Sequence, residues 1–182
     1  MTVTINGNGT ITPTSAVQPT GAILQVVQSV KTDTTSIGAL YDSPTDTGIS
    51  CSITPSATSS KILVDCNLVT ASTDSFGMYL WLVRGSTQIL LSDAAGNRTR
   101  STKFITTYSN SQDGYKVGDV NIKYLDSPSY SLEDTITYKV QGAIYSVSSS
   151  KQFYINRCHN DNNDPAYDGR STSTITLMEI AG

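Results

Sequence analysis

Charged side chains are scarce in this sequence. Asp, Glu, Lys and Arg make up 15% of its 182 residues, against about 25% in an average soluble domain, and Ser and Thr fill much of the polar surface instead. The net charge is −3, and the 12 Lys and Arg residues are scattered along the chain. Nucleic-acid binding needs a concentrated positive patch, so we expect no nucleic-acid partner. A charge-poor surface rich in hydroxyl groups is typical of extracellular or particle-surface β proteins.

Cysteine and histidine are also rare. Cys51, Cys66 and Cys158 are too few and too far apart for a disulfide scaffold or a four-thiolate zinc site. The chain has a single histidine, and it lacks the nucleophile elbow, the zinc-protease helix, the phosphate-binding glycine loop and the dinucleotide fingerprint. We therefore expect a protein that is not an enzyme, with no catalytic residue, no metal and no cofactor.

Long apolar runs are missing as well. No segment approaches the 18 or more residues of a membrane span. The first residues, MTVTINGNGT, lack the basic and apolar regions of a secretory signal. We expect a chain that is soluble as synthesised and has no membrane contact.

From residue 21 onward, short β-type segments alternate with turn residues, and none has the apolar spacing of a helix. Ile136, Tyr138 and Val140 alternate with polar residues, as do Ile62 and the next inward positions Val64, Cys66 and Leu68. This pattern predicts one antiparallel β-sandwich domain over residues 21–182, and eight core strands in two sheets would make it a jelly roll. The expected strands are 23–30, 48–54, 61–70, 76–84, 88–92, 103–108, 120–125, 135–141, 151–156 and 173–180.

Segments 48–54 and 61–70 can be registered as one hairpin with its turn at residues 57–60. Apolar residues then face one another throughout, and a slip of one residue would destroy the match. Cys51 and Cys66 would lie side by side, able to form a disulfide in an oxidising environment. In a reducing one they would stay two small buried apolar residues. The predicted pairs are Ile49 with Leu68, Cys51 with Cys66 and Ile53 with Val64.

Residues 1–20 differ from the rest. They contain turn residues and few large apolar side chains, too few to offset the entropy of ordering them. They are interpreted as an extended N-terminal arm that docks on another surface, with a tail of no role as the alternative. The residues expected to make that attachment are Val3, Ile5, Ile11 and Val17.

The final segment, STSTITLMEI, is apolar on both sides of a strand. Ile175 and Leu177 point to one face, and Met178 and Ile180 point to the other. A strand of this kind needs cover on both faces, inside a sandwich or at a subunit interface. These four residues are therefore expected at the interface of a homotrimer, which favours an assembly protein over an enzyme.

The loop 158–170 concentrates reactive residue types. Its Cys and His could ligate a soft metal and its carboxylates could hold Ca²⁺, but the spacing fits no known template. Asn and Asp are also common loop formers, so we expect a structural loop. Paired carboxylates of a polysaccharide depolymerase are a remote alternative. The residues concerned are Cys158, His159, Asp161, Asp164, Asp168 and, for the depolymerase, Glu133.

Tyrosine is over-represented, with ten copies against three Phe and one Trp. Its flat apolar ring and polar tip suit both carbohydrate stacking and protein interfaces. Tyr138 and Tyr154 fall at strand positions and are expected in the core. A possible glycan-contact surface would instead use the tyrosines in or beside loops, which are Tyr108, Tyr115, Tyr130 and Tyr167.

Three segments in order, SFGMYLWLVRGSTQIL, YLDSPSYSLEDTITYKVQ and FYINRCHNDNNDPAYDGRSTSTITLMEIAG, resemble jelly-roll modules of tailed-phage virion proteins, particularly those of cyanophages and other marine phages. The shared pieces are an R-G turn after an apolar meander, an I-N-R strand before an Asn/Asp-rich loop, and a terminal S-x-I-T-x-M-E-I. The resemblance covers about residues 22–182. It implies a trimer shaped like the globular heads of the complement and tumour-necrosis-factor families, located in the virion and assembled in the host cytoplasm.

Such modules serve either as head-decoration (cement) proteins or as fibre tips, so two functions stay open. The first is a trimer that binds the major capsid protein through its arm and stabilises the shell. The second is a short tail fibre that binds host surface polysaccharide. The long repetitive shaft of fibre proteins is missing, and an arm of twenty residues spans at most about 65 Å, which favours the capsid role.

Overall fold

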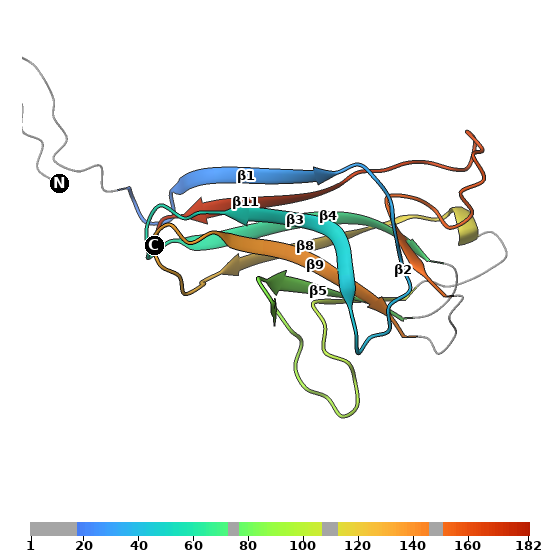
Figure 1. The fold of residues 1–182 in the computed structure, drawn as a ribbon, viewed down its shortest axis with the longest axis horizontal. Coiled ribbons are helices and arrows are strands. Elements are labelled where there is room, and N and C mark those ends of the chain that lie inside the picture. The colour runs from blue at the N-terminus through green and yellow to red at the C-terminus, as the bar shows by residue number, and fades with distance from the viewer. Residues whose placement is uncertain (1–17, 73–76, 107–112, 146–150) are drawn as a thin grey trace, which may run out of the picture.

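The structure of this protein is a computed structural model that describes residues 18–72, 77–106, 113–145 and 151–182. Two antiparallel β-sheets pack face to face as an elongated sandwich (Figure 1), so the predicted all-β class is confirmed. In these ranges the only helix is a 3₁₀ turn, η1, at Asp113–Tyr115. The described residues contain no helix of the length and apolar character needed to cross a bilayer. Outside them lie the predicted arm contacts Val3, Ile5, Ile11 and Val17, together with Tyr108.

Short segments with apolar residues at alternate positions form the strands, because only a period of two places all of them on one face. The described strands are β1 Ile23–Lys31, β2 Thr35–Ile37, β3 Thr45–Ile53, β4 Lys61–Ser72, β5 Gly77–Arg84, β6 Thr87–Ile89, β7 Lys103–Thr106, β8 Gly118–Asp126, β9 Ile136–Ile144, β10 Phe153–Ile155 and β11 Ser173–Ile180. Strand β2 was not predicted, because its three residues carry too little pattern.

The first sheet has six strands. Its main part runs β1-β11-β4-β8, and the far end of β4 pairs with β10, which pairs in turn with β2. The second sheet has five strands in the order β3-β9-β5, and β5 then pairs with both β6 and β7. Strand β4 is thus central in the first sheet, and β9 and β5 are central in the second.

The inward faces of both sheets build one apolar core. The predicted inward positions of β4 and β9 are all buried there, including Cys66 and Tyr138. Full burial of a large apolar side chain contributes about 1.5–3 kcal/mol relative to exposure, so this core supplies most of the stability. Alternation alone identified these positions correctly.

The predicted hairpin is wrong. Cys51 of β3 lies opposite Tyr138 of β9, whereas Cys66 of β4 lies between Ile175 of β11 and Ile122 of β8. Strands β3 and β4 belong to different sheets, so residues 54–60 cross from one sheet to the other. The inward side chains of these strands meet across the core, not along a ladder.

All three cysteines are free and buried. Burial raises the pKa of the Cys66 thiol to about 12, because a thiolate in an apolar core is poorly solvated. Cys66 is therefore a small apolar core residue, and Cys51 in the opposite sheet is another.

The first and last described segments of the chain lie side by side at one end of the sandwich. The amide of Gly21 donates to the carbonyl of Ala181 (2.8 Å), and the amide of Ala181 donates to the carbonyl of Ala22 (2.9 Å). We call this end, with residues 18–22, 54–60, 127–135 and 180–182, the terminal end. The opposite end, with η1 and residues 156–172, is the loop end (Figure 1).

A buried carboxylate closes the terminal end. Glu179 points inward from β11, is fully buried, and accepts hydrogen bonds from Ser60 Oγ (2.7 Å), Gln25 Nε2 (2.7 Å) and the amide of Ser56 (2.8 Å). Burial alone would raise the pKa of Glu179, but the bonds from Ser60, Gln25 and Ser56 outweigh it and hold the pKa below its ordinary value. The crossing loop 54–60 is therefore fastened to β11 through one side chain.

A buried amide fastens the loop end. Asn156 follows β10 with a φ of 63°, a left-handed conformation that Asn tolerates better than most residues. Its Nδ2 donates to the carbonyls of Lys31 (2.8 Å) and Asp33 (3.0 Å), and its Oδ1 accepts from Ser173 Oγ (2.6 Å). Ser173 Oγ in turn accepts from the amide of Val69 (3.1 Å). One residue thus links β1, β4, β10 and β11.

Candidate functional site

The outer face of the six-stranded sheet carries a line of apolar side chains. Val26 lies opposite Met178, Met178 opposite Leu63, and Leu63 opposite Leu125. These four residues, one each from β1, β11, β4 and β8, point away from the core and form what we call the apolar row. With strands about 4.8 Å apart, the row is about 14 Å wide.

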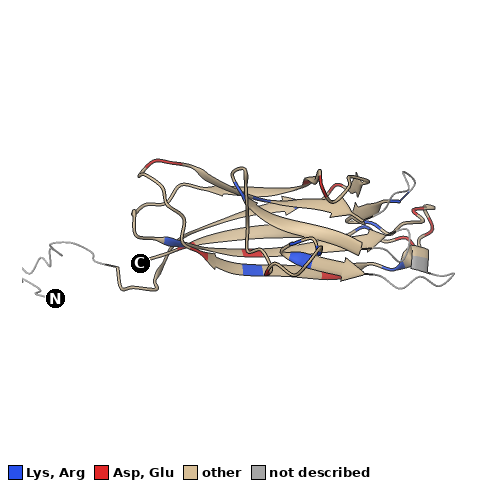
Figure 2. Cartoon of the chain, turned by 90° about the horizontal axis from the view of Figure 1, so that it is seen from below, with Lys and Arg blue, Asp and Glu red and all other residues tan. Residues whose placement is uncertain are grey.

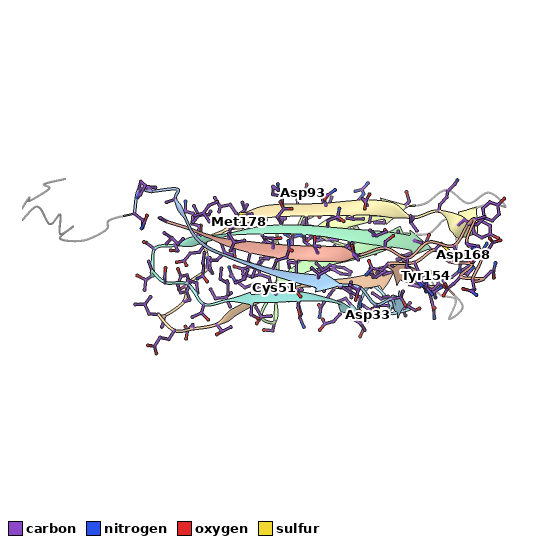
Figure 3. All side chains as sticks on the ribbon, turned by 90° about the horizontal axis from the view of Figure 1, so that it is seen from above. Asp33, Cys51, Asp93, Tyr154, Asp168 and Met178 are labelled. Carbon is purple, nitrogen blue, oxygen red and sulfur yellow. The ribbon has the colours of Figure 1, made fainter. Side chains whose placement is uncertain are left out.

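Much of the apolar row faces solvent in the single chain. Val26 is 54% exposed and Leu125 is 46% exposed, while Met178 and Leu63 are half-buried. Ile23, which lies opposite Ile180, extends the apolar surface toward the terminal end. Met178 lies toward the terminal end of the sandwich (Figure 3). Contiguous exposed apolar surface of this kind marks an interaction site.

Toward the loop end, the next rows of the same face are mainly polar, apart from the exposed Val30, and several of their side chains pair within the chain. Gln28 Nε2 donates to Thr176 Oγ1 (2.8 Å), Lys123 forms an ion pair with Asp65 (2.8 Å), and Asn67 donates to Asn121 across β4 and β8 (3.0 Å). The charged residues are few and spread over the molecule (Figure 2). The face thus has an apolar part beside a polar part, the composition of an interface core with a polar rim.

The four residues predicted for a subunit interface divide between the two faces of β11. Ile175 and Leu177 are fully buried in the core of the single chain, so they have no surface left for a partner. Met178 and Ile180 point outward, on the apolar face. Val26, Leu63 and Leu125 were missed, although Leu63, an apolar residue between the inward Ile62 and Val64, already signalled an apolar outward position.

The loop 158–170 is held by its own polar groups. Cys158 Sγ donates to Asp168 Oδ1 (3.2 Å), and burial raises the pKa of the Cys158 thiol. Asp161 pairs with Arg170 (2.8 Å) and Arg157 (3.4 Å). Among the residues that the structure describes, no three His, Cys, Asp or Glu side chains form a group that could hold a metal ion.

The sequence neighbours Cys158 and His159 have separate partners. The ring of His159 stacks on Tyr154 with centroids 5.5 Å apart, and its Nδ1 lies 3.2 Å from the Tyr154 hydroxyl. The guanidinium of Arg157 lies 3.9 Å from the centre of the Tyr154 ring. The imidazole therefore packs on Tyr154 whereas the thiol contacts Asp168, and both of these partners lie at the loop end (Figure 3).

The candidate carboxylates of a depolymerase are not brought together as one site. Glu133 lies in the terminal-end loop after β8, whereas Asp161, Asp164 and Asp168 lie in the loop end. Asp164 Oδ1 accepts from the amide of Ala166 (2.8 Å), which uses this carboxylate in a local turn. Their arrangement is that of loop residues.

The predicted surface tyrosines have different surroundings. Tyr115 and Tyr167 are exposed and pack on each other at the loop end, with centroids 5.3 Å apart. Tyr130 is partly buried against the core, and its hydroxyl donates to the carbonyls of Ala57 and Ser60. Tyr138 and Tyr154 are buried, as predicted.

In comparisons with known proteins, no family model matches the chain and no curated protein matches it. Inference about function therefore rests on the surface geometry and on the sequence segments.

Proposed function

We propose that this chain is a homotrimeric structural protein of a tailed-phage virion and that it decorates the head surface as a cement protein. The observation that carries the assembly part is the apolar row Val26, Met178, Leu63 and Leu125, which leaves contiguous apolar surface open to solvent across four strands of one sheet face. A second copy of the chain presents the same surface, and a closed ring of copies buries all of it.

The strand order supports a jelly roll. With β2, β6 and β10 left out, the chain visits the two sheets so that β1-β11-β4-β8 faces β3-β9-β5-β7. The first and last strands are neighbours, and consecutive strands alternate between the two sheets except for β5 and β7, which follow each other and pair in the same sheet. Two Greek keys wound together produce this order. It agrees with the fold that the sequence resemblance implies.

The position of the chain start supports attachment through residues 1–20. Residues 18–22 leave the terminal end beside Ile23 and Ile180, next to the apolar row. A trimer closed on that row would bring three copies of residues 18–22 to one end. Three weak attachments to the major capsid protein would then act together, and their combined avidity exceeds that of one by orders of magnitude.

A short tail fibre that binds host surface polysaccharide is the second candidate. The exposed aromatic side chains on the outer face of the five-stranded sheet, Phe104 and Tyr145, favour it. Cement and fibre roles differ in what fails when the protein is missing.

The deciding experiment compares particles with and without the protein. A cement role predicts particles that still adsorb and infect but lose DNA sooner on heating or chelation. Deletion of residues 2–18 should leave a folded trimer that no longer attaches to heads. Heads of full thermal stability combined with failed adsorption would replace the cement role with the fibre role.

A further inference from the structure

An open groove of about 620 Å³ lies on the outer face of the five-stranded sheet, bordered by β5, β7 and the loop 90–102. Three aromatic side chains, Tyr79, Phe104 and Tyr145, line it together with the polar residues Asp93, Asn97 and Arg98. Its volume lies within the range of about 300–1,000 Å³ usual for small-ligand sites. The loop that forms one wall projects from the body of the sandwich (Figure 1).

Tyr79 and Phe104 form a partly open aromatic floor, and Tyr145, which also lines the groove, packs on Tyr41 with centroids 5.2 Å apart. Tyr79 packs against Phe104 with centroids 4.9 Å apart, and its other neighbour is the buried Trp81 at 5.8 Å. Phe104 is 56% exposed and Tyr145 is 58% exposed. Large exposed apolar rings cost free energy in water, so rings held open along a groove indicate a ligand with apolar faces.

The orientation of Phe104 depends on a glycine. A Cβ atom placed on Gly77 would lie 2.5 Å from Cε2 of Phe104. The ring therefore lies over the backbone of β5 at a position where any side chain would displace it. This close approach keeps one face of Phe104 turned outward.

The wall is rigidly attached to the sheet. Trp81 Nε1 donates to the carbonyl of Arg100 (2.7 Å), and Arg100 Nε donates to the carbonyl of Ser92 (2.6 Å). Within the described residues, the side chains of Asp93 and Asn97 have no hydrogen-bond partner, which leaves their donors and acceptors for a ligand. Asp93 lies at the outline of the molecule (Figure 3). A preformed groove with unoccupied polar groups loses little entropy on binding.

We infer that this groove binds a neutral oligosaccharide. A pyranose ring has one or two apolar C–H faces that stack on aromatic rings and a rim of hydroxyl groups that both donate and accept, which matches Phe104 and Tyr145 beside Asp93 and Asn97. Asp93 and Arg98 balance in charge, so the groove attracts neither an anion nor a cation. The inference concerns the groove alone and does not depend on the place of the protein on a virion.

The test uses the purified full-length protein and an array of neutral glucan, mannan and galactan oligosaccharides, with uronic-acid and sulfated oligosaccharides as comparators. The best neutral binder is then titrated by calorimetry and by fluorescence. The chain has a single tryptophan, Trp81, whose ring packs against Tyr79 with centroids 5.8 Å apart, so a sugar on the groove floor should change its emission. Absence of binding to every neutral oligosaccharide, or preference for the charged comparators, overturns the inference.

Variants locate the binding. Phe104→Ala should weaken binding at least tenfold, which corresponds to about 1.4 kcal/mol, and Phe104→Tyr should restore it because the ring is kept. Gly77→Ala should also weaken binding by displacing Phe104, with little change in melting temperature. Tyr167→Ala, which removes an exposed tyrosine at the loop end, is the matched control and should bind normally. Unchanged affinity in Phe104→Ala, or a change in oligomer mass instead of affinity, contradicts a saccharide site.

Discussion

The two ends of the sandwich are closed by different chemistry. At the terminal end, short loops converge on the carboxylate of Glu179, which accepts from Ser60, Gln25 and Ser56. At the loop end, long segments converge on the amide of Asn156, which donates to two backbone carbonyls and accepts from Ser173. One end therefore depends on a group that titrates, and the other depends on a neutral group.

The two closures serve different parts of the surface: one lies beside the proposed interface, and the other holds the long loops. The apolar row approaches the terminal end, so the closure there holds the loop 54–60 to β1 and β11 beside the proposed interface. The loop end carries the stacked group Arg157, Tyr154 and His159, in which the tyrosine is buried, and its neutral closure should hold the same loops over a wide pH range.

The largest expected effect is on assembly. Met178→Asp places a charge in the centre of the apolar row, and burying an unpaired charge at an interface costs several kcal/mol. We expect the trimer to dissociate to the chain mass of 19.5 kDa, measured by light scattering at micromolar concentration. Thr174→Asp, on the polar part of the same strand face, should leave a trimer. A wild-type protein that is already monomeric would contradict the proposed assembly.

The next effect tests the loop end. Asn156→Ala removes three hydrogen bonds and places a residue less tolerant of positive φ in a left-handed conformation, so the free energy of unfolding should fall by about 3 kcal/mol. Chemical denaturation measures it. Asn163→Ala is the control, because Asn163 also has a positive φ of 60° but is exposed. Equal losses in the two variants would show that only backbone strain matters.

A smaller effect tests the terminal end. Glu179→Gln replaces an acceptor of several hydrogen bonds with a group that also donates, and should cost about 2 kcal/mol at pH 7. Because the folded pKa of Glu179 is below its ordinary value of 4.5, its contribution is fully present above that value. It is lost as the pH falls through the folded pKa. The variant should therefore lose less stability than wild type between pH 5 and pH 3.

The control at the same end is Glu133→Gln, whose side chain is exposed. Its acid dependence should match that of wild type. Identical pH profiles for wild type and Glu179→Gln would show that ionisation of Glu179 does not contribute to the stability of the terminal end.

The smallest effect concerns the surface ion pairs of the loop end. Asp161→Asn breaks the pairs with Arg170 and Arg157, which are partly exposed and should contribute about 0.5 kcal/mol. A thermal melt should shift by no more than a few degrees. A loss comparable with that of Asn156→Ala would mean that charge, and not the buried amide, fastens this end.

Alternation in the sequence predicted the all-β class and the inward positions of β4 and β9. It could not predict which strands are neighbours, because any two alternating strands match apolar to apolar when paired. The error over Cys51 and Cys66 follows from this. Their shared inward orientation is correct, yet their ladder partners, Tyr138 and Ile175, are far away in the chain.

The same limit applies to the site. Met178 and Ile180 were recognised on β11 because one strand shows its own two faces. The apolar row forms only because the pairing of strands distant in the sequence places Val26, Leu63 and Leu125 in line with Met178. The inward orientation of Glu179 could have been predicted, since it lies at the same alternate positions of the strand as Ile175 and Leu177. Its role depends on hydrogen-bond donors from a loop about 120 residues earlier.

The pairing of β1 with β11 also has a mechanical consequence. Strand β1 runs away from the terminal end with β11 beside it over eight register pairs, from Ile23 to Lys31. A pull on residues 18–20 directed away from the sandwich acts along the axis of β1, so the hydrogen bonds of this ladder are loaded together in shear. Bonds that share a load resist more force than bonds that open one after another. A tether anchored in these residues would therefore stay attached under tension that would peel an edge strand pulled sideways.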